Sequence, residues 1–115
     1  MKLAIVGGRA FSDYELLKSW IQFFLNDTDN LIIISGGAKG ADGLGKQFAA
    51  EFGLEYIEFP ANWNKHGKAA GFIRNQQIVD ACDMVLAFWD GKSQGTADTI
   101  EKAKRAKKPT FIVYF

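Results

Sequence analysis

Two glycine-rich segments of this chain could each hold a phosphate group. Residues 35–42 read Ser-Gly-Gly-Ala-Lys-Gly-Ala-Asp, and residues 90–96 read Asp-Gly-Lys-Ser-Gln-Gly-Thr; each follows an apolar run that predicts a strand. Glycine lets backbone N–H groups approach an anion, and a following helix adds its unbonded N-terminal donors and the positive end of its dipole. Two such segments in a short chain predict a phosphate-bearing ligand such as a nucleotide.

Two arginines strengthen this prediction. Arg9 follows a pair of glycines, and Arg74 lies in a Gly-Phe-Ile-Arg-Asn-Gln run. A planar guanidinium can hold a phosphate through two parallel hydrogen bonds, which a lysine cannot do. The alternatives are a salt bridge from Arg9 to Asp13 and an ordinary helix-surface position for Arg74. The predicted ligand-binding residues are Gly8, Arg9, Ser35, Gly36, Gly37, Gly40, Asp42, Arg74, Asn75, Ser93, Gly95 and Thr96.

Several of the candidate side chains have more than one role open to them. Asp42 could compensate the helix dipole as a capping residue, bind a ribose hydroxyl, or act as a general base. Ser93 and Thr96 could donate hydroxyl groups to a phosphate or cap the last helix. Trp63 and Trp89 could stack on a base or simply cover the sheet. The sequence therefore assigns no catalytic residue.

Other common kinds of site do not fit the chain. The glycine segments match neither G-x-G-x-x-G nor G-x-x-x-x-G-K-[ST], which argues against a standard dehydrogenase or P-loop nucleotidase. Tight strand–helix turns without a ligand are the simplest alternative. One cysteine, Cys82, and one histidine, His66, are too few for a usual zinc site, so we expect no metal and no cofactor. Cys82 lies in an apolar stretch and is expected to be buried.

The elements that must position these residues alternate between strands and helices. A capping-box pattern of Ser12 and Glu15 predicts the start of the first helix, which should end near Leu25 before a turn at 26–30. Residues 62–67 are expected to form a loop. The predicted strands are 2–6, 31–35, 55–59, 84–89 and 110–115, and the later helices are 41–52, 68–81 and 96–107.

This alternation predicts an α/β fold. Crossover connections make the sheet parallel, and mostly apolar strands indicate that both of its faces are covered. We expect a Rossmann-like three-layer sandwich with a five-stranded sheet in the order 3-2-1-4-5. Ligands of such sheets bind beyond the carboxyl ends of the strands, where the winding direction reverses. Both glycine segments and Arg9 should lie at this edge.

Size and charge set further limits. The 115 residues fit one domain, and a hydrophobic content of 48% predicts an ordered core. A net charge of +1 counts against nucleic acid as a partner, and the basic run 102–108 is expected to be a solvated helix end. No apolar run is long enough to span a bilayer and no signal peptide is visible, so we expect a cytoplasmic protein without a membrane partner.

Several motifs occur in a fixed order along nearly the whole chain, at residues 7–9, 35–42, 60–63, 67–71, 74–75 and 88–96. This ordered set resembles the SLOG superfamily, named for the Smf/DNA-processing proteins and the Lonely Guy enzymes, and within it the small single-domain YspA-type branch. The resemblance implies one nucleotide-binding domain over 1–115 that binds a nucleotide or nucleotide-derived ligand as a sensor or binding module. It leaves a homo-oligomer open.

Two alternative functions follow from other members of the superfamily. Some are phosphoribohydrolases with the motif P-G-G-x-G-T-x-x-E, whose glutamate is needed to cut the base from a nucleoside monophosphate. Here Thr99 occupies the glutamate position, and Glu101 lies about 200° further round the helix. Hydrolysis would therefore need another carboxylate, such as Asp42 or Asp90. The second alternative is single-stranded DNA binding, as in the DNA-processing members.

Overall fold

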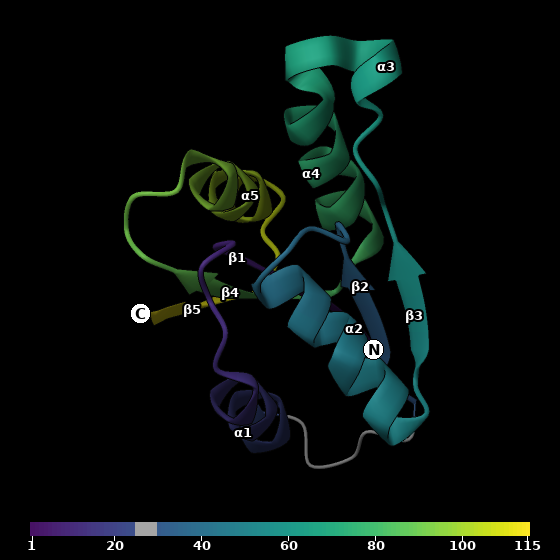
Figure 1. Ribbon diagram of the computed structural model, residues 1–115, viewed down its shortest axis with the longest axis vertical. Helices are drawn as coiled ribbons and strands as arrows, with labels where there is room; N and C mark the ends of the chain where they lie inside the picture. Colours follow the sequence, from purple (N-terminus) through teal and green to yellow (C-terminus); the bar gives the residue numbers. More distant parts are fainter. Residues whose placement is uncertain (25–29) are drawn as a thin grey trace.

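The computed structural model describes residues 1–24 and 30–115 (Figure 1). The predicted end of the first helix at Leu25 and the predicted turn at 26–29 lie outside the described residues. The rest of the chain forms a sheet with helices on both faces, which confirms the predicted three-layer α/β architecture.

The sheet has five parallel strands in the order β3-β2-β1-β4-β5, as predicted. The central strand β1 pairs with β2 on one side and with β4 on the other, so the winding reverses beside its carboxyl end. The register places Gly7 of β1 opposite Phe88 of β4. The strands are β1 (Lys2–Gly7), β2 (Ile32–Ser35), β3 (Glu55–Glu58), β4 (Met84–Trp89) and β5 (Thr110–Tyr114).

Two separate cores hold the helices on the sheet. Side chains alternate along a strand, so Leu3 and Ile5 of β1 pack with α1 (Tyr14–Phe24) and α2 (Ala41–Phe52). The intervening Ala4 and Val6 pack with α4 (Ala70–Ala81) and α5 (Gln94–Arg105) on the opposite face. Cys82 is 1% exposed in the second core, which confirms its predicted burial.

The cap of α1 differs from the prediction. Asp13, rather than Ser12, precedes the first helical residue, and the Asp13 Oδ1 accepts a 3.0 Å hydrogen bond from the N–H of Leu16. Both residue types are good caps, and the carboxylate has the position from which a side chain reaches the third helical N–H. The helix thus begins at Tyr14, and Glu15 is not part of a capping box with Ser12.

The predicted loop at 62–67 is wrong for most of its length. Trp63–His66 form the short helix α3, and Gly67–Ala69 form a 3₁₀ turn, η1, that leads into α4. The Asn62 Oδ1 caps α3 by accepting a 3.1 Å hydrogen bond from the N–H of Lys65. A residue read as loop-forming is therefore also the helix cap. In Figure 1, α3 and the start of α4 project beyond the carboxyl edge of the sheet.

Candidate functional site

A cavity of about 510 Å³ lies at the carboxyl ends of β1 and β4, where the winding of the sheet reverses. We call it the main cavity. Its walls come from the turn after β1, the start of α2, α3, η1 and α4, and the first turns of α5. A smaller side cavity of about 240 Å³ adjoins it, and the two share Arg9, Ala38, Trp63 and Arg74. The predicted edge of the sheet therefore carries a hollow.

The first glycine loop, residues 36–40, is held in place by side chains from two helices. The Asp42 Oδ2 of α2 accepts hydrogen bonds from the N–H groups of Gly36 at 3.1 Å and Ala38 at 3.4 Å. From α4, the Arg74 Nη1 donates to the carbonyl of Gly36 at 3.0 Å. Arg74 is therefore a loop-binding residue and not an ordinary helix-surface residue.

Burial is the main influence on the Asp42 carboxyl. It raises the pKa of Asp42 to about 6, although the Arg74 charge and the two backbone N–H groups work in the opposite direction. The side chain is only 6% exposed, yet it contributes to the wall of the main cavity. Asp42 thus organises the backbone of the first glycine loop with a carboxyl group whose pKa burial holds above its usual value.

Close packing explains why glycine occupies this loop. A methyl group at Gly36 would overlap the Arg74 guanidinium, and one at Gly40 would overlap the carbonyl oxygen of Gly8. Gly37 has a φ of +73°, and its Cα lies under the carboxylate of Glu58. Gly40 therefore joins the turn after β1 to the first glycine loop, while Gly36 admits the arginine.

The second glycine loop, residues 90–93, is organised from within. The Asp90 Oδ1 accepts 2.8 Å hydrogen bonds from the N–H groups of both Lys92 and Ser93, and these bonds lower the pKa of Asp90. The Trp89 indole N–H donates to the Ser93 carbonyl at 3.0 Å. Trp89 lines neither cavity and supports this loop instead, so of the two candidate tryptophans it is Trp63 that borders the cavities.

The first turn of α5 also lines the main cavity. Ser93, Gly95 and Thr96 contribute to the wall, and the backbone N–H groups of a first helical turn have no acceptor within the helix. The Ser93 side chain makes no capping bond; the Thr96 Oγ1 donates to the Ser93 Oγ at 3.4 Å. Asn75 of α4 fixes the position of this turn, because its Nδ2 donates a 3.2 Å hydrogen bond to the Gly95 carbonyl.

Ten of the twelve predicted residues line a cavity. Ser35 and Gly40 do not, because Ser35 is fully buried below the first glycine loop and Gly40 packs against the turn after β1. The main cavity contains Gly8, Arg9, Asp42, Arg74, Asn75, Ser93, Gly95 and Thr96. The side cavity contains Gly36 and Gly37, together with the two arginines.

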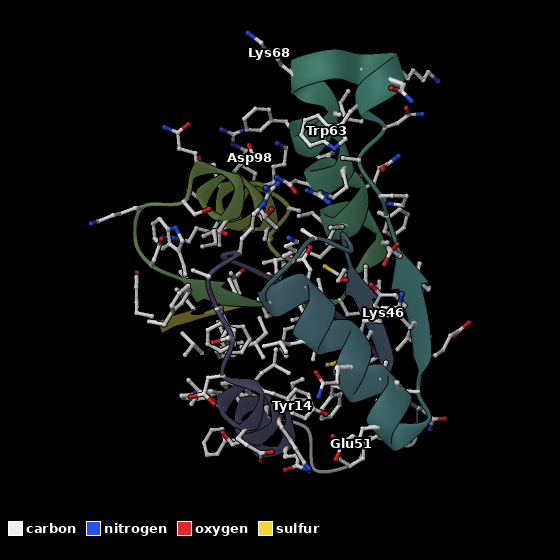
Figure 2. All side chains as sticks on the ribbon, in the orientation of Figure 1. Tyr14, Lys46, Glu51, Trp63, Lys68 and Asp98 are labelled. Atoms are coloured by element: carbon white, nitrogen blue, oxygen red, sulfur yellow. The ribbon has the colours of Figure 1, made fainter. Side chains whose placement is uncertain are left out.

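The lining residues that were not predicted include the charged Glu58 and Lys68 and the aromatic Phe72 and Phe115. Glu58 ends β3 at the same edge as Gly36, and Phe72 is three residues from Asn75 and so shares its helix face. The position of Glu58 at the end of a predicted strand and the spacing of Phe72 from Asn75 could both have been used to predict these residues from the sequence. Figure 2 shows Lys68 at the end of the molecule near α3, with Trp63 in front of α4. Trp63 packs over Gly71, where a methyl group would lie 3.5 Å from the indole.

The carboxylates and the cations of the main cavity differ in their partners. Asp42 and Asp90 both accept backbone hydrogen bonds, whereas Arg9 and Lys68 form no salt bridge within the described part of the chain. The predicted alternative of an Arg9–Asp13 pair is therefore wrong. Uncompensated positive charge at the mouth of the cavity would attract an anion.

The position of the phosphoribohydrolase glutamate holds no acid. Thr99 is 2% exposed, lines the main cavity, and donates from its Oγ1 to the Gly95 carbonyl at 3.3 Å. Glu101 lies outside the cavity and pairs with Arg105 at 3.4 Å. Residues 1–24 and 30–115 contain no group of His, Cys, Asp and Glu that could hold a metal ion. None of the helices in these ranges is both long and apolar enough to cross a bilayer.

Similarity to known proteins agrees with this architecture. A family model described as the YspA, cpYpsA-related SLOG family matches residues 1–66. The Gene 61 protein of Mycobacterium phage D29 is 32% identical to this chain, with 94% of this chain and 92% of that protein covered.

Three solved structures share the fold at lower identity. DNA processing protein A from Streptococcus pneumoniae has a TM-score of 0.80 at 24% identity, with 96% of this chain and 49% of that chain covered. The Helicobacter pylori DNA processing protein A, which binds single-stranded DNA, has a TM-score of 0.74 at 22% identity, with 97% of this chain and 64% of that chain covered. TM1055 has a TM-score of 0.68 at 22% identity, with 95% of this chain and 71% of that chain covered. This chain thus spans about half the length of the Streptococcus protein. With its matched family model and its phage relative, the chain belongs to the YspA, cpYpsA-related SLOG family.

Proposed function

We propose that this protein binds a nucleotide or nucleotide-derived ligand in the main cavity and acts as a sensor or binding module. The observation that carries the proposal is that the first turn of α5, Arg9 and the Arg74-braced first glycine loop all border one cavity of about 510 Å³. Cavities of roughly 300–1,000 Å³ are typical of small-molecule sites. Such sites commonly lie where the winding of an α/β sheet reverses.

The phosphate is expected between Arg9 and the N-terminus of α5. Arg9 is exposed beside the cavity, and the first-turn N–H groups of Gly95 and Thr96 provide donors at the positive end of the helix dipole. Arg74 supplies a second cation whose position is set by the Gly36 carbonyl and by Asn75, whose Oδ1 accepts from the Arg74 Nε at 3.1 Å. Binding would therefore need little rearrangement of this arginine.

A thermal-shift screen tests the proposal. The probes are nucleoside mono-, di- and triphosphates, ADP-ribose, NAD and cyclic nucleotides, and a ligand at a hundred times its Kd should add about 2.7 kcal/mol of stability. Arg74→Ala and Gly37→Val should weaken binding of any probe that shifts the wild type. Arg105→Ala is the matched control, because that arginine lies on the exposed face of α5. Unchanged affinity in both cavity variants would show that the ligand binds elsewhere.

Single-stranded DNA binding is the second candidate. Three aromatic side chains at the cavity are exposed: Trp63 at 55%, Phe72 at 49% and Phe115 at 45%. The Lys102 Nζ lies 5.5 Å from the centre of the Phe72 ring. Exposed aromatic rings beside cations are typical of single-strand binding surfaces. The Helicobacter pylori relative binds single-stranded DNA, whereas the net charge of +1 argues for a weaker interaction here. A salt-dependent shift with oligothymidine that Trp63→Ala abolishes would support this candidate.

Hydrolysis of an N-glycosidic bond has less support. The motif position holds Thr99, and the buried Asp42 carboxylate already accepts two backbone hydrogen bonds. Each nucleotide that shifts the melting temperature is incubated with the protein, and chromatography for free base then distinguishes hydrolysis from binding alone. Base release that is lost in Asp42→Asn would identify an enzyme, and binding without release supports the sensor.

A further inference from the structure

The side cavity contains a carboxylate that a chain of hydrogen bonds holds in place. The Glu58 Oε1 accepts a 2.8 Å bond from the Tyr56 hydroxyl, and that hydroxyl lies 2.7 Å from the Oγ of the fully buried Ser35. Burial raises the pKa of Tyr56 to about 12, so the phenol stays protonated and donates. The carboxylate lies directly over Gly37, where an added Cβ would be 2.5 Å from the Glu58 Cδ.

Among the described residues, few groups use the hydrogen-bonding capacity of the exposed Glu58 carboxylate. An ionised carboxylate has about four acceptor sites, and the Tyr56 hydroxyl is its only hydrogen-bond partner in residues 1–24 and 30–115. Glu58 pairs with no cation within these ranges. A negative, acceptor-only group would repel a phosphate but would bind hydroxyl or amino donors. The side cavity is therefore suited to a different part of the ligand from the main cavity.

The two cavities meet at side chains that both can use. Arg9, Arg74 and Trp63 line the main cavity and the side cavity alike. A nucleotide whose phosphate lies by Arg9 in the main cavity could place its sugar beside Glu58 and its base against Trp63. Asp42 is less suited to hold the sugar, because its Oδ2 already accepts from two N–H groups and its side chain is 6% exposed.

We infer that Glu58 binds the ribose hydroxyls of the ligand, so that the site takes ribonucleotides in preference to 2′-deoxyribonucleotides. This inference rests on the nucleotide-binding function proposed above and narrows its ligand class. The 2′-hydroxyl is the group by which proteins distinguish the two sugars. A ribose preference would also argue against single-stranded DNA as the physiological ligand.

Titration calorimetry with three probes tests the inference. AMP should bind about 10- to 100-fold more tightly than 2′-deoxy-AMP, the range for a hydrogen bond to a charged group. IMP, which lacks the exocyclic amino group of AMP, should bind like AMP if the sugar supplies the donors. Glu58→Gln should reduce the ratio of AMP to 2′-deoxy-AMP affinity to near one. Glu55→Gln, at an exposed glutamate of the same strand that lines neither cavity, should leave the ratio unchanged.

The possible results separate this inference from the function on which it rests. Equal affinity for AMP and 2′-deoxy-AMP, or a preference that survives in Glu58→Gln, would overturn the ribose assignment and leave nucleotide binding intact. A large loss for IMP, with none for 2′-deoxy-AMP, would also overturn it and would assign Glu58 to the base. If none of the three probes binds, both the ribose assignment of Glu58 and the proposed binding of purine nucleotides would be overturned.

Discussion

The two glycine loops have similar sequences but are stabilised in different ways. The first is held from outside by Arg74 of α4 and Asp42 of α2, which contact its backbone. The second is held by Asp90 within the loop itself and by the neighbouring Trp89. Glycine content alone therefore does not reveal whether a loop is braced. A loop braced by distant residues is preorganised for a ligand, which reduces the ordering cost of binding.

The largest contrast is expected from one substitution made in both loops. Gly40 and Gly91 both have a φ of +82°, which is unfavourable for alanine, and the ψ of −132° at Gly40 lies in a region that glycine alone adopts readily. A methyl group at Gly91 would meet open space, whereas at Gly40 it would overlap the backbone of Gly8 and Arg9. Gly40→Ala should therefore lose about 3 kcal/mol or more, and Gly91→Ala only about 1–2 kcal/mol, in urea denaturation. Equal losses would contradict the difference in bracing.

The two loop carboxylates should respond oppositely to pH, and Asp42 should show the larger effect. Its folded-state pKa of about 6 is above the value of an unfolded aspartate, so the favourable contribution present at low pH is lost as pH rises from about 4 to 6. Asparagine does not titrate, so Asp42→Asn should remove this loss. The free energy of unfolding of the variant minus that of the wild type should therefore be about 1–3 kcal/mol more favourable at pH 7 than at pH 4. Denaturation curves at the two pH values measure it. A difference that does not change with pH would show that burial does not control this group.

Arg74→Lys should have an intermediate effect. Lysine keeps the charge but cannot bond the Gly36 carbonyl and the Asn75 side chain together, so about 1–2 kcal/mol of stability should be lost. Arg105→Lys provides the control, because its exposed pair with Glu101 contributes little. If both variants unfold at the same urea concentration, Arg74 does not brace the loop.

Asp90→Asn should give the smallest change. Hydrogen bonds from the loop N–H groups lower the pKa of Asp90, so its contribution is present above the pKa of the unfolded state and is lost as pH falls through the lower folded value. Melting temperatures from pH 2 to pH 6 should show a slightly weaker acid destabilisation in the variant than in the wild type. A stronger one would mean that the amide cannot replace the carboxylate as an acceptor.

The fold could be predicted because its signals are local and repeated. Apolar runs, capping residues and glycine stops identified every strand, and the crossovers required a parallel sheet. The errors came where one residue type serves two purposes. Asn62 is common in loops, yet it caps α3, and Ser12 and Asp13 compete for the same cap position.

The site was less predictable because much of it is made by contacts between distant residues. The residues next to strand ends, such as Arg9 and Gly37, could be assigned to the edge of the sheet from topology alone. The role of Arg74 depends on a contact with Gly36, 38 residues away in sequence. The brace on Glu58 likewise requires Tyr56 and Ser35 to meet across two strands. No sequence period encodes such contacts.

The exposed position of Trp63 provides an intrinsic fluorescence probe of the two cavities. Of the three tryptophans, Trp20 packs on Phe24 with ring centres 5.5 Å apart, and the Trp89 N–H is bonded to Ser93. Trp63 is 55% exposed and borders both cavities, so its fluorescence should be the most red-shifted of the three. A base stacked on this indole would quench that long-wavelength emission. Ligand occupancy could then be followed without a label, in real time and in competition with other ligands.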